Sequence, residues 1–427
     1  MRRTLLVAVT LLLGGSVLVA SPPPPVTAQP QPEAALAGAV QVSVGIYHSC
    51  ALLTNGQVRC WGYNAYGQLG DGTIDDSPRA VVVRALSGPG PLTGVRQVAV
   101  GRYHTCALLT NGQVRCWGHN TAGQLGIGNL SEHHRPVAVL NAAGTGRLTG
   151  VRQLSTEYEG GCATLTNGQA RCWGSDDYGE LGNGPPTPDA VSLPVAVRAV
   201  AGSGPLTGVA AMAGGYDTNC ALLTNRQIRC WGDSTTNGSL GNGVPDVDSP
   251  RPTIVRNVAD TGPLTAVRNV AHSGYHGCAN LTNGQVRCWG ENDTAQLGNN
   301  TLDPHDTPVV TLRNGATGPL TNVQQVGVGT EFSCALLTNG QVRCWGANDY
   351  GQVGVGSIDA FVRPVPQDVA APSGSGNLTG VVQVDVGDSH TCVVRSNREV
   401  RCWGYGIYGQ LGNGAEVTRG RPVLVVV

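Results

Sequence analysis

The chain has 427 residues, a formal net charge of −1 at pH 7, and 27 basic residues, every one of which is arginine. The absence of lysine excludes Schiff-base and lysine general-base chemistry. The charge balance supplies no basic stripe, so no nucleic-acid partner is expected. Glycine contributes 62 residues and phenylalanine only 2, a composition typical of turns and short strands.

Residues 1–28 have the pattern of an export signal. Two arginines precede an apolar run at residues 5–13, small residues follow, and cleavage is expected after Ala20 or after Ala28. An uncleaved anchor is the alternative, although the apolar run is short for a membrane span. Residues 29–39 are interpreted as a proline-rich spacer. We therefore expect an extracellular or cell-surface protein with no membrane span after cleavage, in an oxidising environment that suits an even number of cysteines.

One string of residues occurs seven times with small changes. Its first copy reads Cys-Ala-Leu-Leu-Thr-Asn-Gly-Gln-Val-Arg-Cys-Trp-Gly, and successive copies are 56 or 58 residues apart. The copies contain all 14 cysteines and all 7 tryptophans. Such a period indicates an array of small units, and residues 40–427 are predicted to form one closed domain. The copies begin at Cys50, Cys106, Cys162, Cys220, Cys278, Cys334 and Cys392.

Each unit is predicted to be a four-stranded β-meander. In the second copy, the expected strands cover residues 95–100, 105–109, 113–117 and 135–139. Alternating valines, glycine-containing turns and the lack of a helical period favour β structure throughout the repeats. The predicted fold class is therefore all-β.

The two cysteines of each copy are predicted to face each other across a hairpin. A three-residue turn at residues 110–112 places Leu109 opposite Gln113. Cys106 then lies opposite Cys116 at a non-hydrogen-bonded position, where Cα atoms approach to about 4.5 Å and a disulfide fits. Metal binding is the alternative, but zinc-binding pairs are usually closer in sequence. The expected disulfides are Cys50–Cys60, Cys106–Cys116, Cys162–Cys172, Cys220–Cys230, Cys278–Cys288, Cys334–Cys344 and Cys392–Cys402.

Two copies lack the glycine of this turn and carry Arg226 and Arg398 in its place. Either the arginine adopts a left-handed backbone at some cost, or the preceding asparagine does so and the turn shifts. Both alternatives are open at this point.

A four-stranded sheet of this size can bury both faces only by packing against similar sheets. Seven sheets arranged in a ring cover one another and leave only short edges. We therefore predict a seven-bladed β-propeller of four-stranded antiparallel blades, with one hairpin disulfide per blade. The last strand, at residues 421–427, is predicted to join the first copy in one sheet and so close the ring.

The repeated tryptophan is expected to fill the space between neighbouring blades. The repeated arginine precedes it by two residues, as Arg115 precedes Trp117, and so lies on the same face of its strand. We interpret this arginine as an aliphatic stem with a cation–π contact to the tryptophan. A ring of seven anion-binding arginines is the functional alternative.

Residues 48–70, 104–126 and 390–412 contain the repeat string, preceded by His-Ser/Thr and followed by Gly-Gln-Leu-Gly. This run resembles the repeat of the regulator of chromosome condensation family, and the resemblance extends over residues 40–427. It implies a seven-bladed β-propeller. It is much less specific for function, because one fold hosts many activities.

The functional implication depends on which members of that family are considered. The founding members exchange nucleotide on a small nuclear GTPase and touch chromatin, which is not expected of an exported chain without a basic tail. The chain is similar in type to the secreted bacterial members, one of which grips an enzyme with its propeller face. Plant photoreceptor relatives use extra tryptophans on one face, whereas every tryptophan here belongs to the repeat.

The connections at one rim of the predicted propeller differ among the seven copies. They are the turns between the first and second strands and the loops between the third and fourth strands. Tyrosine, arginine and acidic side chains on rigid turns are typical of protein-binding surfaces, so we hypothesise a recognition face for a protein partner. Ordinary solvated turn residues are the alternative. The candidate binding residues are Tyr47, Tyr63, Arg102, Tyr103, His119, Tyr158, Tyr216, Asp233, Tyr275, Glu291 and Tyr405.

Histidines recur two residues before the first cysteine and are expected to be buried and hydrogen-bonded rather than catalytic. Weak metal-binding patterns at residues 71–76, 132–134 and 303–306 lack a full ligand set, and we expect no metal and no cofactor. No serine elbow, phosphate loop or HExxH motif is present, so no catalytic residue is predicted. The recurring histidines are His48, His104, His276 and His390.

The leading prediction from the sequence is an exported, monomeric propeller that binds another macromolecule, in the first place a protein, through its variable rim. One alternative is a hydrolase or lyase acting on extracellular polysaccharide, with two carboxyl groups about 5–10 Å apart near the central channel. The other alternative is a structural or adhesive module at the cell surface.

Overall fold

The computed structural model describes residues 33–156, 158–200, 204–234, 238–315 and 317–427. The predicted export signal and the first part of the predicted spacer, residues 29–32, lie outside the described residues. Residues 34–427 form one compact unit that holds every described strand. The described part of the chain contains no helix long and apolar enough to cross a membrane.

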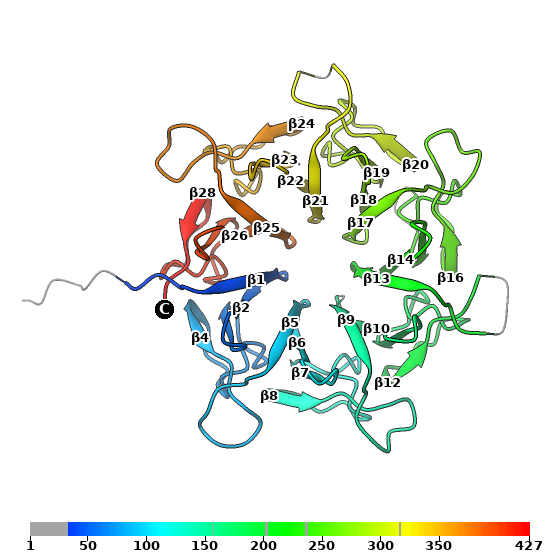
Figure 1. Cartoon of the computed structure of the whole chain (residues 1–427), viewed down its shortest axis with the longest axis vertical. Coiled ribbons are helices and arrows are strands. Elements are labelled where there is room, and N and C mark those ends of the chain that lie inside the picture. Colours follow the sequence, from blue (N-terminus) through cyan, green and yellow to red (C-terminus); the bar gives the residue numbers. More distant parts are fainter. Residues whose placement is uncertain (1–32, 157, 201–203, 235–237, 316) are drawn as a thin grey trace, which may run out of the picture. The chain divides into compact units, whose positions relative to one another are not determined.

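The compact unit is a ring of seven four-stranded antiparallel sheets, called blades 1 to 7 in chain order (Figure 1). Each blade is a meander of four consecutive strands, which confirms the predicted seven-bladed propeller. The strands are β1 (Ala39–Val44), β2 (His48–Leu53), β3 (Val58–Gly62) and β4 (Ser77–Val82); β5 (Val95–Val100), β6 (His104–Leu109), β7 (Val114–Gly118) and β8 (His133–Ala138); β9 (Val151–Thr156), β10 (Gly160–Leu165), β11 (Ala170–Gly174) and β12 (Val191–Ala196); β13 (Val209–Gly214), β14 (Thr218–Leu223), β15 (Ile228–Gly232) and β16 (Ser249–Ile254); β17 (Val267–His272), β18 (His276–Leu281), β19 (Val286–Gly290) and β20 (His305–Val310); β21 (Val323–Val328), β22 (Phe332–Leu337), β23 (Val342–Gly346) and β24 (Arg363–Asp368); and β25 (Val381–Val386), β26 (His390–Arg395), β27 (Val400–Gly404) and β28 (Arg419–Leu424).

The hairpin between the second and third strands of each blade has the predicted register. In blade 2, Leu109 N donates to Gln113 O at 2.8 Å, and Cys106 lies opposite Cys116. Gly112 takes the left-handed position of the turn with φ 76°. All seven predicted disulfides are present, with Cα atoms 4.0–4.1 Å apart, as expected for close pairs across a hairpin.

The two hairpins without glycine keep the same turn. Arg226 and Arg398 themselves adopt left-handed backbone conformations, with φ 63° and 64°. Arg226 N donates to Leu223 O at 2.8 Å, which is the same bond that Gly112 N makes to Leu109 O at 2.9 Å. The register is therefore preserved, and the strain of a left-handed non-glycine residue is accepted at both places.

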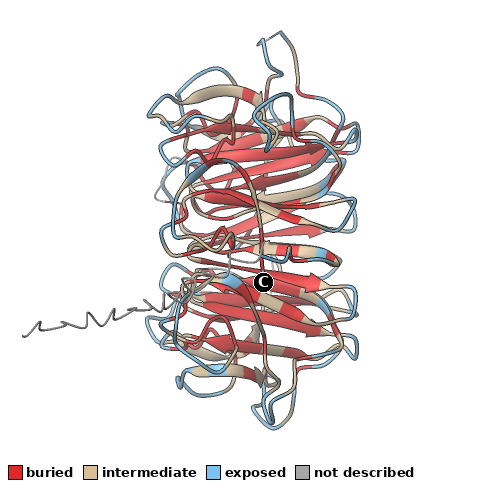
Figure 2. Ribbon diagram, turned by 90° about the vertical axis from the view of Figure 1, so that its left-hand side faces the viewer, coloured by how far each residue is buried: buried red, intermediate tan, exposed pale blue. Residues whose placement is uncertain are grey.

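The up-and-down strand order places the connections on two opposite faces of the ring. The turns between first and second strands and the long loops between third and fourth strands form one face, which we call the loop face. The hairpins between second and third strands and the links from one blade to the next form the other, which we call the hairpin face. Seen edge-on, the second and third strands of the blades are mostly buried, the outermost strands are mostly of intermediate burial, and the connections on both sides are largely exposed (Figure 2).

Each blade is fastened to the preceding one by its tryptophan. All seven indole rings are fully buried, and each Nε1 donates to a backbone carbonyl in the preceding blade. Trp117 of blade 2, for example, donates to Gln68 O at 2.9 Å. Trp61 of blade 1 donates to Gln410 O of blade 7 at 2.8 Å, so the pattern continues between the first and last blades. The expected place of the tryptophans between blades is confirmed.

Glutamines on the innermost strands form a second set of contacts between blades. Gln41 Oε1 accepts from Val98 N at 3.0 Å, and its Nε2 donates to Val98 O at 2.8 Å. Gln383 makes the same pair of bonds with Val42 and so links blade 7 to blade 1. The backbone edge that faces the channel is thereby satisfied by side chains of the neighbouring blade.

The repeated arginine does not make the predicted cation–π contact with tryptophan. Arg115 donates to Val114 O at 3.1 Å and to Gln113 Oε1 at 3.2 Å, and Arg343 pairs with Asp368 at 2.7 Å. With these polar partners, the guanidinium stays partly exposed to solvent. A contact with the fully buried indole would have required the guanidinium to lose its hydration. The cation–π contacts found in the described residues belong to Arg102 on the loop face.

The ring does not close in the predicted way either. The last strand does not join the first copy, because β28 pairs with β27 and blade 1 already contains four strands of its own. The segment before β1 instead lies beside the end of the chain: Leu36 N donates to Val425 O at 2.8 Å, and Ala35 forms a bridge with Val426. The ends therefore meet as a seam between two complete blades.

Candidate functional site

Most tyrosines of the chain are in contact with one another on the loop face. In the described residues, ten of the 11 tyrosines make ring contacts, and seven of these form one continuous group with His119 over blades 6, 7, 1 and 2. Tyr47 lies inside this group, stacked on Tyr103 at 5.3 Å and in edge contact with Tyr408 at 5.4 Å, measured between ring centroids. We call this group the tyrosine cluster; its tyrosines are Tyr47, Tyr63, Tyr66, Tyr103, Tyr350, Tyr405 and Tyr408.

Arg102 joins the tyrosine cluster to three further tyrosines. Its guanidinium lies 4.5 Å from the ring centroid of Tyr103 and 4.2 Å from that of Tyr158. Tyr158 contacts Tyr216 at 4.5 Å, and Tyr216 contacts Tyr275 at 5.2 Å. The aromatic contacts therefore include side chains from all seven blades, although the residues are far apart in the sequence.

Three of these blades are joined at the mouth of the central channel. The Tyr216 hydroxyl of blade 4 donates to Asp388 Oδ1 of blade 7, which also accepts from the Thr330 hydroxyl of blade 6. The Ser389 hydroxyl donates to the other oxygen of Asp388 at 2.8 Å. Burial, followed by the charge of Asp388, raises the pKa of Tyr216, so its hydroxyl stays protonated and can donate. With both oxygens engaged, Asp388 serves as a latch between blades.

The latch residues Tyr216, Thr330 and Asp388 line one of two cavities along the channel. The cavity at the mouth has a volume of about 100 Å³ and is lined by the turns between first and second strands. The cavity below it has a volume of about 360 Å³ and is lined by the innermost strands of the blades. Asp385 of β25 lies in its wall, where burial raises the pKa of its carboxyl to about 7.

Carboxylates collect on the loop face in blades 3 to 6. Burial in the first place, together with the negative charges of Glu180 and Asp233, raises the pKa of Asp217 to about 7. The pKa of Glu331 is raised for the same reasons, by burial first and by neighbouring carboxylates second. We call this group the acidic arc; it consists of Glu159, Asp177, Asp217, Asp233, Glu291, Asp293, Glu331 and Asp349. The loop face thus combines an aromatic part with an acidic part.

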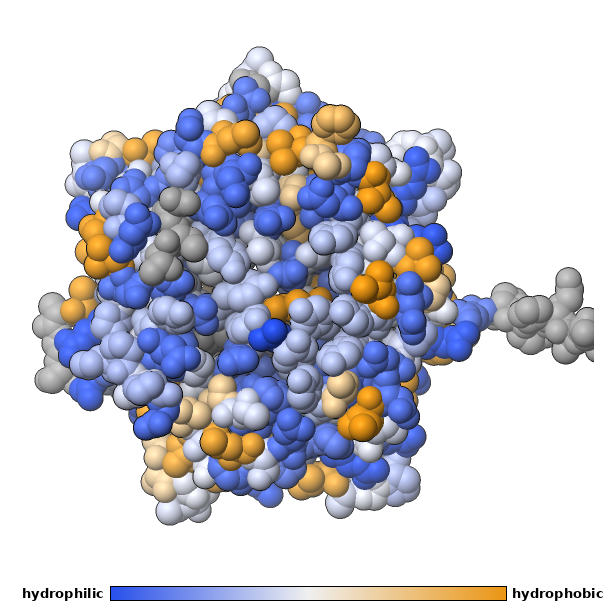
Figure 3. All heavy atoms as spheres, turned by 180° about the vertical axis from the view of Figure 1, so that it is seen from behind, coloured by the Kyte–Doolittle hydropathy of each residue, from blue (hydrophilic) through white to orange (hydrophobic). Residues whose placement is uncertain are grey.

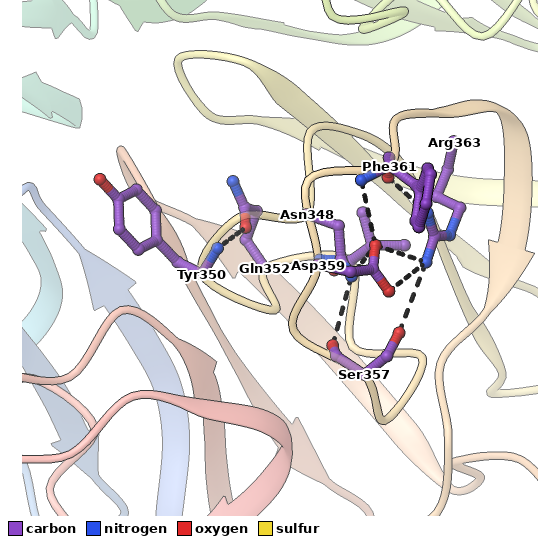
Figure 4. A network of polar contacts seen from close by, with 8 residues as sticks. Asn348, Tyr350, Gln352, Ser357, Asp359, Phe361 and Arg363 are labelled. Atoms are coloured by element: carbon purple, nitrogen blue, oxygen red, sulfur yellow. Dashed lines mark hydrogen bonds and ion pairs between the residues drawn. The ribbon is translucent and has the colours of Figure 1, made fainter.

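In six of the seven blades, the long loop of this face is held by a buried polar side chain three residues after the tryptophan, an asparagine in four of them. In blade 2, Asn120 Oδ1 accepts from Leu125 N at 2.9 Å, and its Nδ2 donates to Asn129 O at 2.9 Å. In blade 6, Asn348 Nδ2 donates to Ser357 O at 3.2 Å (Figure 4). These bonds inside the loops fix the backbone that carries the tyrosines.

In blade 6, the hydrogen bonds within the loop keep the apolar side chain of Phe361 exposed to solvent. Asp359 accepts from Phe361 N at 3.2 Å and pairs with Arg363 at 3.0 Å, while Phe361 itself is 76% exposed (Figure 4). On the face seen in Figure 3, hydrophilic side chains predominate near the centre, and most apolar side chains lie toward the periphery.

All eleven candidate binding residues belong to the loop face. Asp233 and Glu291 lie in the acidic arc, and the other nine take part in the aromatic contacts or join them through Arg102. Their role in binding stays a prediction. Tyr66, Tyr350 and Tyr408 of the tyrosine cluster were not predicted; they share with Tyr178 the repeat position five residues after the tryptophan. A comparison of the copies at that position would have found them.

The repeated histidines connect blades, as expected of structural residues. All four are fully buried; His48 Nε2 lies 2.7 Å from Thr105 Oγ1, and His390 Nε2 lies 2.8 Å from Ser49 Oγ. Burial lowers the pKa of His48 to about 3 and that of His390 to about 3, so both rings are neutral near pH 7. In the part of the chain that the structure describes, no three His, Cys, Asp or Glu side chains come together in a way that could hold a metal ion.

Comparisons with protein families and curated proteins agree on one repeat. Two models of the regulator of chromosome condensation (RCC1) repeat match the chain, one at residues 39–68, 95–124, 323–352 and 381–410, the other at 55–108, 283–336 and 339–394. The ultraviolet-B receptor UVR8 of Arabidopsis thaliana is 30% identical over 387 residues, which cover 90% of this chain and 81% of that protein. The E3 ubiquitin-protein ligase HERC2 of Homo sapiens is 30% identical over 376 residues, which cover 87% of this chain but 7% of that protein.

Solved structures share the fold at lower identity. Yeast RCC1 (Prp20), in its complex with Kap60, has a TM-score of 0.68 and 21% identity, covering 90% of this chain and 85% of that chain. Human WBSCR16 has a TM-score of 0.68 and 22% identity, covering 87% of this chain and 95% of that chain. A structure of Prp20p from Saccharomyces cerevisiae, described with its binding to Gsp1p and histones, has a TM-score of 0.67 and 20% identity, covering 92% of this chain and 88% of that chain.

Proposed function

Because the chain belongs to the RCC1 repeat family, we propose that it is a scaffold that binds another protein through its loop face. Protein binding is what the descriptions of yeast RCC1 name, with Kap60, Gsp1p and histones as its partners. No partner of those proteins is transferred to this chain. The seven tryptophans are all buried between blades, so the proposal does not extend to the light reception named for UVR8.

The observation that carries the proposal is the aromatic network of the loop face. Tyrosine combines a large apolar ring with a polar hydroxyl and loses little side-chain entropy on binding, which is why it recurs at the energetic centres of interfaces. The network is half-buried, so its rings are already held in place by their neighbours before a partner arrives. Preorganised contact surface of this kind lowers the entropy lost on association.

An exported location is part of the proposal. The predicted signal at residues 1–28 and the resemblance to secreted bacterial members support it. The seven disulfides support it as well, because disulfides form and persist in oxidising compartments. Recovery of the protein from culture medium, with an N-terminus beyond Ala20, would be the expected result; retention of the whole chain inside the cell would contradict this part.

The binding proposal is tested by capture of partners from the culture medium of the source organism. The double variant Tyr63→Ala/Tyr103→Ala removes two rings from the tyrosine cluster, and we expect it to capture at least about tenfold less of the protein that the wild type retains. Tyr178→Ala is the matched control, because Tyr178 is an exposed loop-face tyrosine outside the described ring contacts. Equal capture by wild type and double variant would refute the proposal.

A further inference from the structure

Most arginines of the propeller lie on the hairpin face. Every blade has one at the second residue of its third strand, from Arg59 in blade 1 to Arg401 in blade 7. Others lie near the start of a first strand, as Arg96 does, or in hairpins and links. In the described residues of the same segments, the acidic side chains are Asp260, Asp368 and Glu399.

The net charge of −1 therefore conceals a separation of charge across the ring. The acidic arc lies on the loop face, and the arginines lie on the opposite face, spread over all seven blades around the axis. Such a distribution produces a positive electrostatic potential over the hairpin face, although the total charge of the protein is close to zero.

Two hairpins accept backbone strain in order to carry an arginine. Arg226 and Arg398 have φ values of 63° and 64°, whereas the other five hairpins place glycine there. A left-handed backbone is unfavourable for a side chain with a Cβ atom, and strain that the fold has not removed is a sign of function. Both side chains are exposed, so burial gives no structural reason for the choice.

The backbone that carries the arginines is held in place by hydrogen bonds. Each link forms hydrogen bonds with the hairpins beside it: Val95 N donates to Gly56 O at 3.1 Å, and Thr110 N donates to Gly94 O at 2.8 Å. The hairpin face therefore offers positive charge on a fixed backbone.

We propose that the hairpin face docks on a phospholipid bilayer surface that contains anionic headgroups. The arginines are spread over the whole face around the axis, as a planar bilayer surface requires. A linear polyanion such as a nucleic acid would instead be matched by arginines along one line. Each arginine near an anionic bilayer strengthens binding about fivefold. This arrangement leaves the loop face pointing away from the membrane and does not depend on what that face binds.

The test is co-sedimentation of the protein without residues 1–28 with lipid vesicles, so that the predicted signal cannot bind lipid itself. Residues 34–427 contain every described strand, which makes this shortened protein suitable. We expect binding to phosphatidylcholine vesicles that contain about one quarter phosphatidylglycerol, weak binding to pure phosphatidylcholine, and loss of binding at about 0.5 M NaCl.

The informative variant is Arg226→Gly/Arg398→Gly, which restores the residue used in the other hairpins. We expect its partitioning to anionic vesicles to fall by about ten- to thirtyfold, from roughly fivefold per arginine, while its melting temperature stays the same or rises. The control Arg251→Gln/Arg419→Gln removes equal charge from exposed sites on β16 and β28, outside the hairpin face, and should bind like the wild type.

Three results would overturn the inference. They are no binding to anionic vesicles at low salt, equal loss of binding in the two double variants, and full binding by Arg226→Gly/Arg398→Gly. Retention on duplex DNA without retention on vesicles would assign the face to nucleic acid instead and would also overturn it.

Discussion

At the scale of single residues, blade 3 carries carboxylates at two buried loop positions where most other blades have amides. Asp176 stands at the place of Asn120, and Glu180 at the place of Gln124. Asp176 is 1% exposed and accepts from Leu181 N at 3.1 Å. Burial in the first place, together with the charge of Glu180, nevertheless raises the pKa of Asp176 to about 6.

This shift predicts that Asp176→Asn stabilises the protein at neutral pH. The unfolded carboxyl titrates near 3.8 and the folded one near 6, so the folded state is progressively destabilised as pH rises between these values. Above pH 6 the whole penalty is present, and the asparagine avoids it. We expect a gain of about 1–2 kcal/mol in the free energy of unfolding at about pH 7.5, measured by urea denaturation.

The gain should shrink as the pH approaches 4, because the folded carboxyl is then protonated and the unfolded one, near its pKa of 3.8, is partly protonated. Asp189→Asn is a suitable control, since Asp189 is exposed and its replacement should change stability by less than about 0.5 kcal/mol. A gain that is the same at both pH values would show that the charge of Asp176 is not its cause.

The roles and contacts of residues at and near the loop face could be predicted only in part from the sequence. The repeat exposed Tyr47 and Tyr103 as variable turn residues, and the place of His48 next to a buried strand indicated a structural histidine. The latch between Tyr216 and Asp388 was beyond reach, because the two side chains come from blades 4 and 7 and no local pattern couples them. Contacts across the channel depend on the radius of the whole ring.

At the scale of the single blade, the hairpin disulfide closes a loop of eleven residues from Cys162 to Cys172 in blade 3. Closing so short a loop reduces the entropy of the unfolded chain by an amount worth roughly 2–3 kcal/mol. Cys162→Ala/Cys172→Ala is therefore expected to lower the urea midpoint under non-reducing conditions, with all other blades still bridged.

Full reduction of the wild type with dithiothreitol is the companion measurement, and it should lower the midpoint much further because all seven bridges are lost. An unchanged midpoint in the double variant would mean that the hairpin hydrogen bonds alone set the stability of the blade.

Strand register was the most predictable property of the blade. Counting outward from the turn at Gly112 fixed the cysteine pair, because side chains alternate with a period of two and a one-residue shift would separate the sulfurs. The partner of Arg115 was predicted wrongly, since the sequence places it on the face of Trp117 but does not show how near the polar end of the hairpin lies. Long, flexible side chains choose partners that strand periodicity does not define.

At the scale of the whole molecule, the number of blades followed from the number of repeats, but the way the ring closes did not. Joining β28 to blade 1 would have required blade 1 to lack a strand. The structure instead completes both blades and seals them with Leu36, Val425 and Val426. A strand count from sequence cannot separate these solutions when a short segment before the first strand can pair with the end of the chain.

The seam predicts a position where one small change weakens the whole ring. Val425 is fully buried against Leu36 and Trp61 in the cluster between blades 7 and 1, so Val425→Ala should lower the free energy of unfolding by about 2 kcal/mol. The control is Val417→Ala, because Val417 is exposed and its truncation should have an effect below about 0.5 kcal/mol. Equal urea midpoints for the two variants would contradict a role of the seam in ring stability.

Every blade is made from one uninterrupted stretch of chain, and Val427 N donates to Ala34 O at 3.0 Å. A gene rearranged so that these two residues are linked, with a new start before any other blade, therefore encodes the same seven sheets as a circular permutant. By the same reasoning, recombination between repeats adds or removes an intact unit and never a fragment of one. A single recombination between two repeats of the gene would therefore encode a chain with one repeat more or one repeat fewer.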